Sequence, residues 1–551
     1  MAFPLPEVDL RSEFYWTSGA DGVLRFQNCS DCGSLVHPPS VACHRCRSGQ
    51  LGITAVSGRG TIVGLTINYQ AWQPDLECPY AIAVVAIAED SRVRVTTQIV
   101  GAELDSLEIG QEVAVSFEHR DDVWVPVFTP TGAVPDSELP EVDESVAEVR
   151  AAVRKPVSAR RYEHNSVISG VGSSPIGRRL MADPLSLAVA ACKAAVADAG
   201  LELSDIDGLA TYPGAGVGVG FSEGGLLAVE EALRLQPVWY NGGPEQPGPG
   251  GSVIAAMQAI SAGLCRHVLC FRTVWEATYA ELLRTGRRRL PGSQRVGGPM
   301  TYTAPAGSFS AANTLALGAS HYMHRFGATR ETFGWIALNA RKNAALNPDA
   351  IYRTPLTMDD YLSARMVSSP FGLYDCDVPC DGAIAVVVSA TETARDLRHP
   401  AIRFEAAGTQ IVERVSWDQS TLSHEPQVLG PAAHMWTRTD LRPSDVDLAE
   451  LYDGFTFNCL SWLEALGFCG IGEAPAFLEG GKRIALDGEL PLNTHGGQLS
   501  HGRTHGFGLL QEAVVQLRHQ AGERQVAGAE VAVVSSGGLT PSSALLLVRD
   551  T

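Results

Sequence analysis

The sharpest chemical motif in the sequence is a set of four cysteines near the N-terminus. They form two Cys-x-x-Cys pairs separated by ten residues: Cys29, Cys32, Cys43 and Cys46. Two such pairs on a short hairpin bring four thiolates to the corners of a tetrahedron, which suits Zn²⁺. One structural metal satisfies both pairs, so a zinc ribbon is favoured over a redox role. His37 and His44 lie in the same stretch and are expected to be solvated, because the thiolates already complete the site.

Between residues 58 and 129 the chain consists of short β-type segments. Five segments are β-branched or alternating and are bounded by turn residues: GTIVGLTINYQ, YAIAVVAIAE, RVRVTTQIV, EVAVSFEHR and WVPVFTP. Five strands in about 70 residues predict a small closed barrel of the oligonucleotide/oligosaccharide-binding (OB) type. Nucleic-acid binding by such barrels needs a basic groove, and this segment is acidic. A docking or substrate-gating role is therefore favoured.

After a charged, proline-bearing stretch, the pattern changes to alternating strands and helices. SVISGVGSS (166–174) predicts a strand, and PLSLAVAACKAAVADAG (184–200) predicts an amphipathic helix that ends at a glycine. The next turn, residues 204–207, has a Ser-Asp-x-Asp pattern that recurs at residues 444–447. The echo falls where a protein of two α/β halves would repeat a turn between helix and strand.

Composition and charge limit the function classes. The 551 residues are 45% hydrophobic and 19% charged, with a net charge of −19 and a pI near 5.2. General binding to nucleic acid or to an anionic membrane is disfavoured, since both need a basic face. No apolar run reaches the roughly 18–20 residues that span a bilayer, and the N-terminus lacks signal-peptide features. We therefore expect a cytoplasmic protein without membrane insertion.

From about residue 166 onwards, an ordered set of motifs resembles the thiolase superfamily, in the branch near sterol carrier protein X thiolases and steroid side-chain retro-aldolases. The motifs are SVISGVGSSPIGRR, HVLCFR, LYDCDVPCDGAIAVVV, AELYDGFTFNCLSWLEALGFC, NTHGGQLSHGRTHGFG and VVSSGGLTPSSALLLV. The N-terminal part resembles the rubredoxin-like zinc ribbon and OB-fold module found beside such proteins. The resemblance implies an α/β thiolase fold of two α/β/α halves after a ribbon and an all-β OB barrel. The expected domains are an N-terminal helix and ribbon (1–57), the barrel (58–134), a linker (135–162), a first half with a loop domain (163–395) and a second half (396–551).

Three positions depart from the thiolase pattern. A thiolase carries its nucleophilic cysteine at the N-terminus of a buried helix, where the helix dipole lowers the thiol pKa. The corresponding stretch, residues 241–252, contains no cysteine. The second cysteine of the family falls at Ser535 and Ser536, and the Gly-His-Pro histidine falls within Gly-Arg-Thr at residues 502–504. Claisen chemistry through these groups is therefore disfavoured.

The resemblance to retro-aldolases implies a carbon–carbon lyase that cleaves a β-hydroxyacyl-CoA to a carbonyl product and a shorter acyl-CoA, or condenses them in reverse. This reaction needs a base for the hydroxyl proton and donors for the enolate, but no acyl-enzyme. Tyr452 matches the tyrosine of the Leu-Tyr-Asp-x-Phe-Thr motif, and His505 matches a histidine of the family. Arg503 stands near the place of a second tyrosine. His505, with an ordinary pKa of about 6.5, is expected to shuttle a proton, while Arg503 donates hydrogen bonds and His495 in NTHGG completes the catalytic set.

Each candidate also has a purely structural interpretation. Tyr452 can pack in the core, His495 can hold a loop through hydrogen bonds to the backbone, and Arg503 can form a buried salt bridge. Two other functions also stay open. One is a thiolase or acyltransferase whose nucleophile is Cys376 or Cys459, and the other is a non-catalytic acyl-CoA or lipid-binding partner.

An acidic chain that binds CoA needs local basic residues. The strongest cluster is Arg284, Arg287, Arg288 and Arg289, in the region where thiolases build the loop domain that covers CoA. The CoA phosphates are expected to meet Arg287 and Arg288, with a solvated surface cluster as the alternative.

Other ligand contacts and partners follow from the resemblance. The glycine pair Gly537 and Gly538 is a further expected CoA contact, and aromatic residues around Trp275, Tyr279 and Tyr302 favour a bulky acyl group. We expect structural zinc, CoA as part of the substrate, and a homodimer through the thiolase-like domain.

Overall fold

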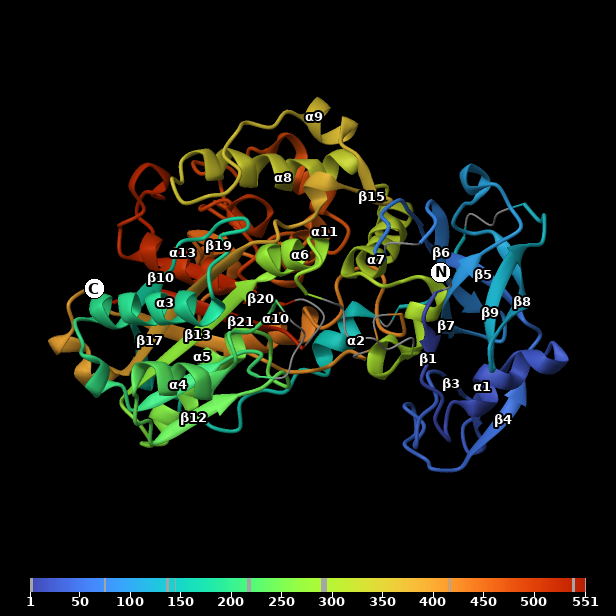
Figure 1. Cartoon of the computed structure of the whole chain (residues 1–551), viewed down its shortest axis with the longest axis horizontal. Helices are drawn as coiled ribbons and strands as arrows, with labels where there is room; N and C mark the ends of the chain where they lie inside the picture. The colour runs from blue at the N-terminus through green and yellow to red at the C-terminus, as the bar shows by residue number, and fades with distance from the viewer. Residues whose placement is uncertain are drawn as a thin grey trace.

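The computed structural model describes residues 3–73, 76–134, 138–143, 145–215, 220–288, 295–414, 416, 418–537 and 541–550. The molecule has two unequal parts side by side along its long axis (Figure 1). The smaller part holds the ribbon and barrel, and the larger part is a mixed sheet covered by helices. The N-terminus lies where the two parts meet, next to α7 (Ala311–Phe326), and the C-terminus lies at the far end of the larger part.

The ribbon is a three-stranded sheet with the order β3-β2-β4, made of β2 (Arg25–Cys29), β3 (Leu35–Val36) and β4 (Leu51–Ala55). The short helix α1 (Glu13–Thr17) precedes it. Tyr15, Trp16 and Phe26 share one apolar core with the barrel, so the ribbon and barrel pack as a unit. The expectation that His37 is solvated is wrong. Its side chain is buried among Tyr15, Phe26 and other aromatic rings.

The predicted five-stranded barrel is confirmed. Its strands run in the order β5-β6-β7-β9-β8, and β5 pairs with β8 to close the barrel: β5 (Arg59–Asn68), β6 (Tyr80–Ile87), β7 (Asp90–Ile99), β8 (Glu112–Arg120) and β9 (Val123–Pro130). Strand β6 is apolar on both faces because its outward side chains also become buried. Ile82 and Val84 pack there against Leu317 of α7 and Leu422. Strands β15 (Met366–Ser368) and β16 (Phe371–Gly372) extend the barrel sheet beside β5.

The larger part is built on a nine-stranded sheet. Its order is β12-β11-β13-β17-β10-β18-β21-β20-β19, from β12 (Trp239–Gly242), β11 (Gly208–Thr211), β13 (His267–Trp275), β17 (Asp381–Ala390), β10 (Ser166–Ser173), β18 (Ile402–Gly408), β21 (Ser543–Arg549), β20 (Val531–Ser536) and β19 (Leu448–Glu450). The two halves meet where β10 pairs with β18.

The two halves repeat one plan. The strand order β11-β13-β17-β10 of the first half is mirrored by β19-β20-β21-β18 in the second. The last aspartate of the repeated Ser-Asp-x-Asp turn has the same structural role in each half. The Asp207 carboxylate accepts hydrogen bonds from the N–H groups of Arg266 and His267, and the Asp447 carboxylate accepts them from Glu530 and Val531. In each half the aspartate ties one strand to its neighbour, which confirms the predicted duplication.

Helices cover the sheet, and others lie in the connections before and between its strands. The sheet helices are α3 (Pro184–Ala199), α4 (Leu226–Leu233), α5 (Gly250–Ser261), α10 (Leu429–Trp436), α11 (Thr456–Ala465) and α13 (Phe507–Leu517). The others are α2 (Val146–Ala151), α6 (Glu276–Arg284), α7, α8 (Arg330–Ala345), α9 (Met358–Ser363) and α12 (Ala474–Leu478). Among the residues described, no helix is both long and apolar enough to cross a membrane.

Candidate active site and metal centre

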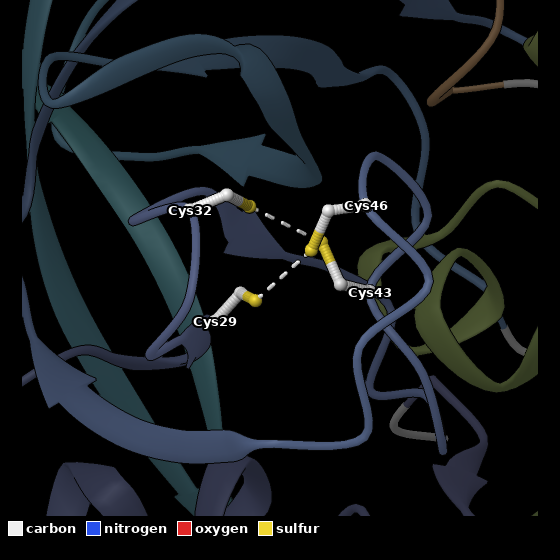
Figure 2. Close-up of side chains that lie close together, drawn as sticks. All are labelled: Cys29, Cys32, Cys43 and Cys46. Carbon is white, nitrogen blue, oxygen red and sulfur yellow. Dashed lines mark hydrogen bonds between the residues drawn. The ribbon is translucent and has the colours of Figure 1, made fainter.

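The four predicted metal ligands come together at the tip of the ribbon. Two loops of the same shape present them, because the N–H of Gly33 donates to the carbonyl of Cys29 and the N–H of Arg47 donates to that of Cys43, both at 2.8 Å. All four Sγ atoms lie within 4.8 Å of one another (Figure 2). The pairs Cys29–Cys46 and Cys32–Cys43 are 3.4 and 3.6 Å apart. A tetrahedral zinc with bonds of about 2.3 Å needs sulfur–sulfur edges of about 3.8 Å, so the residues fit this metal.

A cavity of about 470 Å³ lies between the start of α7, the N-terminus of α5 and the loops that follow β11 and β19. Four predicted residues line it together: Tyr452, Arg503, His505 and Gly537. Asp377 and Arg272 also line it, although the sequence motifs did not single them out. Groups more than 200 residues apart in the chain therefore converge on one apolar-walled site, the usual arrangement of a ligand pocket.

Tyr452 follows the short strand β19 and points into this cavity from a fixed backbone. Its N–H donates to the Ser535 hydroxyl at 2.8 Å. The side chain is only 6% exposed. Burial, followed by the nearby Asp377 carboxylate, raises the pKa of Tyr452 well above its ordinary value. The phenol therefore keeps its proton at neutral pH and acts first as a hydrogen-bond donor.

Arg503 is held by two carboxylates. Its guanidinium bonds to Glu276, the first residue of α6, and lies 3.2 Å from an oxygen of Asp377. Burial, and then the neighbouring Arg272, lower the pKa of Arg503 to about 10, so the group remains a cation at neutral pH. Arg503 therefore forms the buried salt bridge of the structural interpretation and also lines the cavity. Burial, and then the nearby Asp453 carboxylate, raise the pKa of Asp377 well above its ordinary value. The Arg503 guanidinium, 3.2 Å away, is the cation that pairs with its ionised form.

His505 is fixed by Arg272, which projects from β13. A guanidinium nitrogen of Arg272 donates to Nδ1 of His505. Because a guanidinium has only donors, Nδ1 accepts and the ring proton is assigned to Nε2. Burial, then Arg272 and Arg503, lower the pKa of His505 well below its ordinary value. The ring also stacks on Phe221, with centroids 5.4 Å apart. His505 therefore presents a neutral imidazole whose Nε2–H is a donor.

His495 does not join this group. It lies in a separate polar cavity of about 450 Å³, together with His501 and Glu512. Its Nδ1 is 3.3 Å from a carboxylate oxygen of Glu450. Burial lowers the pKa of His495, but Glu450 and the other nearby carboxylates outweigh burial and raise it. The NTHGG motif predicts that this loop lies near the site, but it does not show which of the two cavities the His495 side chain enters.

The cysteines of interest are poorly placed for catalysis. At the N-terminus of α5 the Gly250 N–H donates to the hydroxyl of Ser536 at 3.0 Å, so a serine occupies the region where a thiolase has its second cysteine. Burial and nearby carboxylates raise the pKa values of Cys376 and Cys459 well above the ordinary value of a thiol. Among the described residues that line the cavity there is no cysteine. A thiolate nucleophile is therefore disfavoured.

Family models and known proteins match both parts of the chain. The models "ChsH2, rubredoxin-like zinc ribbon domain", "ChsH2, C-terminal OB-fold domain" and "Thiolase C-terminal domain-like" match residues 16–52, 54–118 and 418–551. A steroid side-chain-cleaving aldolase of Thermomonospora curvata is 35% identical over 392 residues, which cover 70% of this chain and 98% of that protein. This chain belongs to the thiolase-fold aldolases. The 17-hydroxy-3-oxo-4-pregnene-20-carboxyl-CoA lyase of Mycobacterium tuberculosis is 34% identical over 387 residues, which cover 69% of the aldolase described here and 98% of that lyase.

A solved structure agrees with this assignment. The "Ltp2-ChsH2(DUF35) aldolase" is 32% identical and has a TM-score of 0.62, over 70% of this aldolase and 98% of that chain. The predicted thiolase fold behind a ribbon and barrel, and the predicted lyase of the aldolase type, are confirmed. The family models that match the ribbon and the barrel carry the name ChsH2, and the name of that structure gives Ltp2 and ChsH2 separately. In the aldolase described here, the ribbon, the barrel and the thiolase-like part are in one chain.

The expected CoA and acyl contacts of the aldolase lie in different places. Gly537 lines the cavity, and Gly538 lies outside the described residues. Arg287 and Arg288 are exposed beyond the end of α6, and the Arg288 guanidinium lies 5.5 Å from the centre of the Trp275 ring. Arg289 is outside the described residues. Trp275, Tyr279 and Tyr302, which are expected from the sequence to favour a bulky acyl group, do not line this cavity. Its aromatic lining is instead Tyr212, Phe221, Phe309, Tyr452 and Phe455.

Proposed function

We propose that this aldolase cleaves the bond between Cα and Cβ of a β-hydroxyacyl-CoA in the cavity around Tyr452. The hydroxyl proton leaves to a base, the oxygen electrons form a carbonyl at Cβ, and the Cα–Cβ electron pair passes into a thioester enolate. Protonation of the enolate at Cα then gives the shorter acyl-CoA. The observation that carries this proposal is the meeting of Tyr452, Asp377, Arg503 and His505 in a cavity without a cysteine among its described lining residues.

Proton removal is assigned to Tyr452 and Asp377 together. A protonated phenol cannot by itself accept the substrate proton, but it can pass its own proton on while accepting another. Asp377 is the nearby carboxylate, and burial makes it a stronger base than an exposed aspartate. Tyr452 therefore touches the β-hydroxyl, and the Asp377 carboxylate receives the proton that Tyr452 passes on.

Enolate stabilisation is assigned to His505 and Arg503. Arg272 occupies Nδ1 of His505, and a carboxylate oxygen of Glu276 is 3.8 Å from Nε2, beyond hydrogen-bond distance. The Nε2–H is therefore left as the neutral donor to the developing oxyanion. Arg503 adds a cation that two carboxylates hold in place. Fixed donors in a site shielded from water stabilise developing charge without reorganisation. Arg272 is a positioning residue in this scheme.

The acyl group is proposed to be polycyclic, as in a steroid. The aromatic and aliphatic walls of the cavity support a bulky apolar group, and two related proteins carry steroid substrates in their names. The CoA phosphates are proposed to meet Arg287 and Arg288, and the thioester end to meet Gly537 and Gly538.

The test is a panel of β-hydroxyacyl-CoA esters incubated without added CoA, with products identified by mass spectrometry. We expect a carbonyl compound and a shorter acyl-CoA, and in D₂O one deuterium at Cα of that acyl-CoA. A thiolase needs free CoA for cleavage, so a strict requirement for CoA would contradict the aldolase mechanism. A cysteine acylated during turnover would contradict it as well.

Three further assignments belong to the same proposal. Zn²⁺ is held by the four ribbon thiolates as a structural ion, with no part in the reaction. The twelve cysteines form no disulfide, which supports a reducing compartment such as the cytoplasm. A homodimer forms through β12, an edge strand whose Tyr240 is 66% exposed. Light scattering should give about twice the chain mass of 58.6 kDa, and Tyr240→Asp should reduce it toward one chain mass.

A further inference from the structure

A short N-terminal arm, residues 3–7, crosses from the barrel to the segment at residues 295–296 of the larger part. Its strand β1 (Leu5–Pro6) pairs in parallel with β14 (Arg295–Val296). The N–H of Glu7 donates to the carbonyl of Val296 at 2.8 Å, and Arg295 donates to the carbonyl of Pro6 at 3.0 Å. The arm therefore lies in the junction between the two parts of the molecule, where the N-terminus is seen beside α7 (Figure 1).

Phe3, at the start of this arm, connects the barrel to the wall of the catalytic cavity. Its ring meets Tyr80 of β6 edge to face, with centroids 5.1 Å apart. On the other side it stacks on Phe309, with centroids 5.9 Å apart and an angle of 24°. The guanidinium of Arg120 from β8 lies 5.3 Å from the centre of the Phe3 ring. Since Phe309 lines the cavity, Phe3 stands directly behind the wall.

The same barrel residues also hold the backbone just before Phe309. The hydroxyl of Tyr80 donates to the carbonyl of Gly307, and Arg120 donates to the carbonyl of Pro305, both at 2.8 Å. Gly307 has a φ of +88°, and a side chain there would come within 2.6 Å of the Tyr80 ring and 2.9 Å of the Phe3 ring. No side chain larger than hydrogen fits between the barrel and this turn.

The segment after Phe309 is equally fixed. Ser310 is the N-cap of α7, and its hydroxyl accepts from the N–H of Ala312 at 3.2 Å. Asn313, one turn further, donates to Asn68 of barrel strand β5 at 2.9 Å. Phe309 is therefore held between two anchored stretches of backbone, and its ring is supported from behind by Phe3.

We propose that the N-terminal arm determines which acyl groups the aldolase accepts. Phe3 positions Phe309, and Phe309 forms the apolar wall against which a bulky acyl group packs. Phe3 does not reach the substrate, so it is a positioning residue. The proposal rests on the proposed acyl-CoA function and gives the barrel module a part in substrate selection. A small acyl group does not reach this wall and is unaffected by the arm.

The test compares the binding of two acyl-CoA esters that lack a β-hydroxyl and cannot be cleaved, one polycyclic and one butyryl, by calorimetry. Phe3→Ala should weaken binding of the polycyclic ester about tenfold, the effect of losing a well-packed aromatic contact, and leave butyryl-CoA within about twofold. Phe309→Ala should act in the same direction. Adding Phe3→Ala to Phe309→Ala should change the preference by less than about twofold, because the two rings act in series.

Leu10→Ala is the matched control, since this side chain follows the arm and is 96% exposed. It should leave both affinities unchanged. If Phe3→Ala does not fold, Phe3→Leu replaces it and should show a smaller loss in the same direction.

Equal weakening of both esters would overturn the proposal, since the arm would then act on the CoA part or on the whole fold. A lowered melting temperature with unchanged preference would overturn it too, as would failure of the wild-type chain to bind either ester. If the wild-type chain cleaves no β-hydroxy ester but the preference still shifts with Phe3, the arm retains its role and the proposed reaction fails. If cleavage is observed and the preference does not shift, the reaction stands and the arm has no such role.

Discussion

Tyr452→Phe removes one oxygen from the centre of the proposed reaction. The ring, its burial and the 2.8 Å hydrogen bond from the Tyr452 N–H to Ser535 do not depend on the hydroxyl. The fold should therefore be retained, which circular dichroism and the melting temperature can check. What is lost is the hydroxyl that, in the proposed mechanism, touches the substrate β-hydroxyl and passes its proton toward Asp377.

The expected size of the effect follows from its role in the transition state. A positioned acid or base contributes about 10²- to 10⁴-fold, so kcat should fall by this factor, or about 3–5 kcal/mol of transition-state stabilisation. KM should change by less than about threefold, because the hydroxyl contributes mainly to the reacting state.

The assay measures the rate at which the carbonyl product is released from a β-hydroxyacyl-CoA, with mass spectrometry as the detection method. Tyr69→Phe, at a tyrosine that is 45% exposed, is the control and should keep full activity. Asp377→Asn should also lower kcat. The double variant should have a kcat only slightly below that of the less active single variant, because the two residues act as a unit. If Tyr452→Phe keeps kcat within about threefold, the assignment of the proton to this pair is refuted.

Three other predictions concern the metal, the thiols and pH. Cys29→Ser should remove the zinc, about one per chain by metal analysis, and destabilise the barrel with it, whereas Cys78→Ser, outside the ribbon, should retain the metal. Cys376→Ala should keep kcat within about threefold of the wild-type value. A larger loss of kcat, together with an acyl group found covalently on Cys376 of the wild-type protein, would restore the thiolase alternative. Burial lowers the pKa of His37 to about 4 from the ordinary 6.5, so the unfolded chain binds more protons between these values. The free energy of unfolding should therefore fall by about 3 kcal/mol as the pH drops from 6.5 to 4. In denaturant titrations at several pH values, His37→Phe should remove this part of the pH dependence. Equal pH dependence of the unfolding free energy in the two proteins would contradict the prediction.

The parts of the fold that the sequence predicts well are those set by local pattern. The zinc ligands follow from spacing alone, since a metal needs only the right thiols on one hairpin. The barrel strands follow from β-branched segments between turns. The two halves follow from the resemblance to thiolases, with the repeated Ser-Asp-x-Asp turn as one local sign of them. His37 fails for the opposite reason. Its ring packs against Tyr15 and Phe26 and also against Tyr302, which is 265 residues away with ring centroids 5.2 Å apart. Nothing beside His37 in the sequence marks the contact with Tyr302.

The cavity around Tyr452 shows the same division between local pattern and distant contacts. Tyr452, Arg503 and His505 stand in recognisable motifs, but the groups that decide their chemistry lie far away in the chain. Arg272 is 233 residues from His505, and Glu276 is 227 residues from Arg503. One signal was present, because an arginine inside the apolar strand HVLCFRTVW must find buried partners. Its partners are the carbonyls of Tyr212 and Phe221 and Nδ1 of His505. In the proposed mechanism the ring proton of His505 therefore stays on Nε2 as a hydrogen-bond donor, instead of moving as the motif alone suggests.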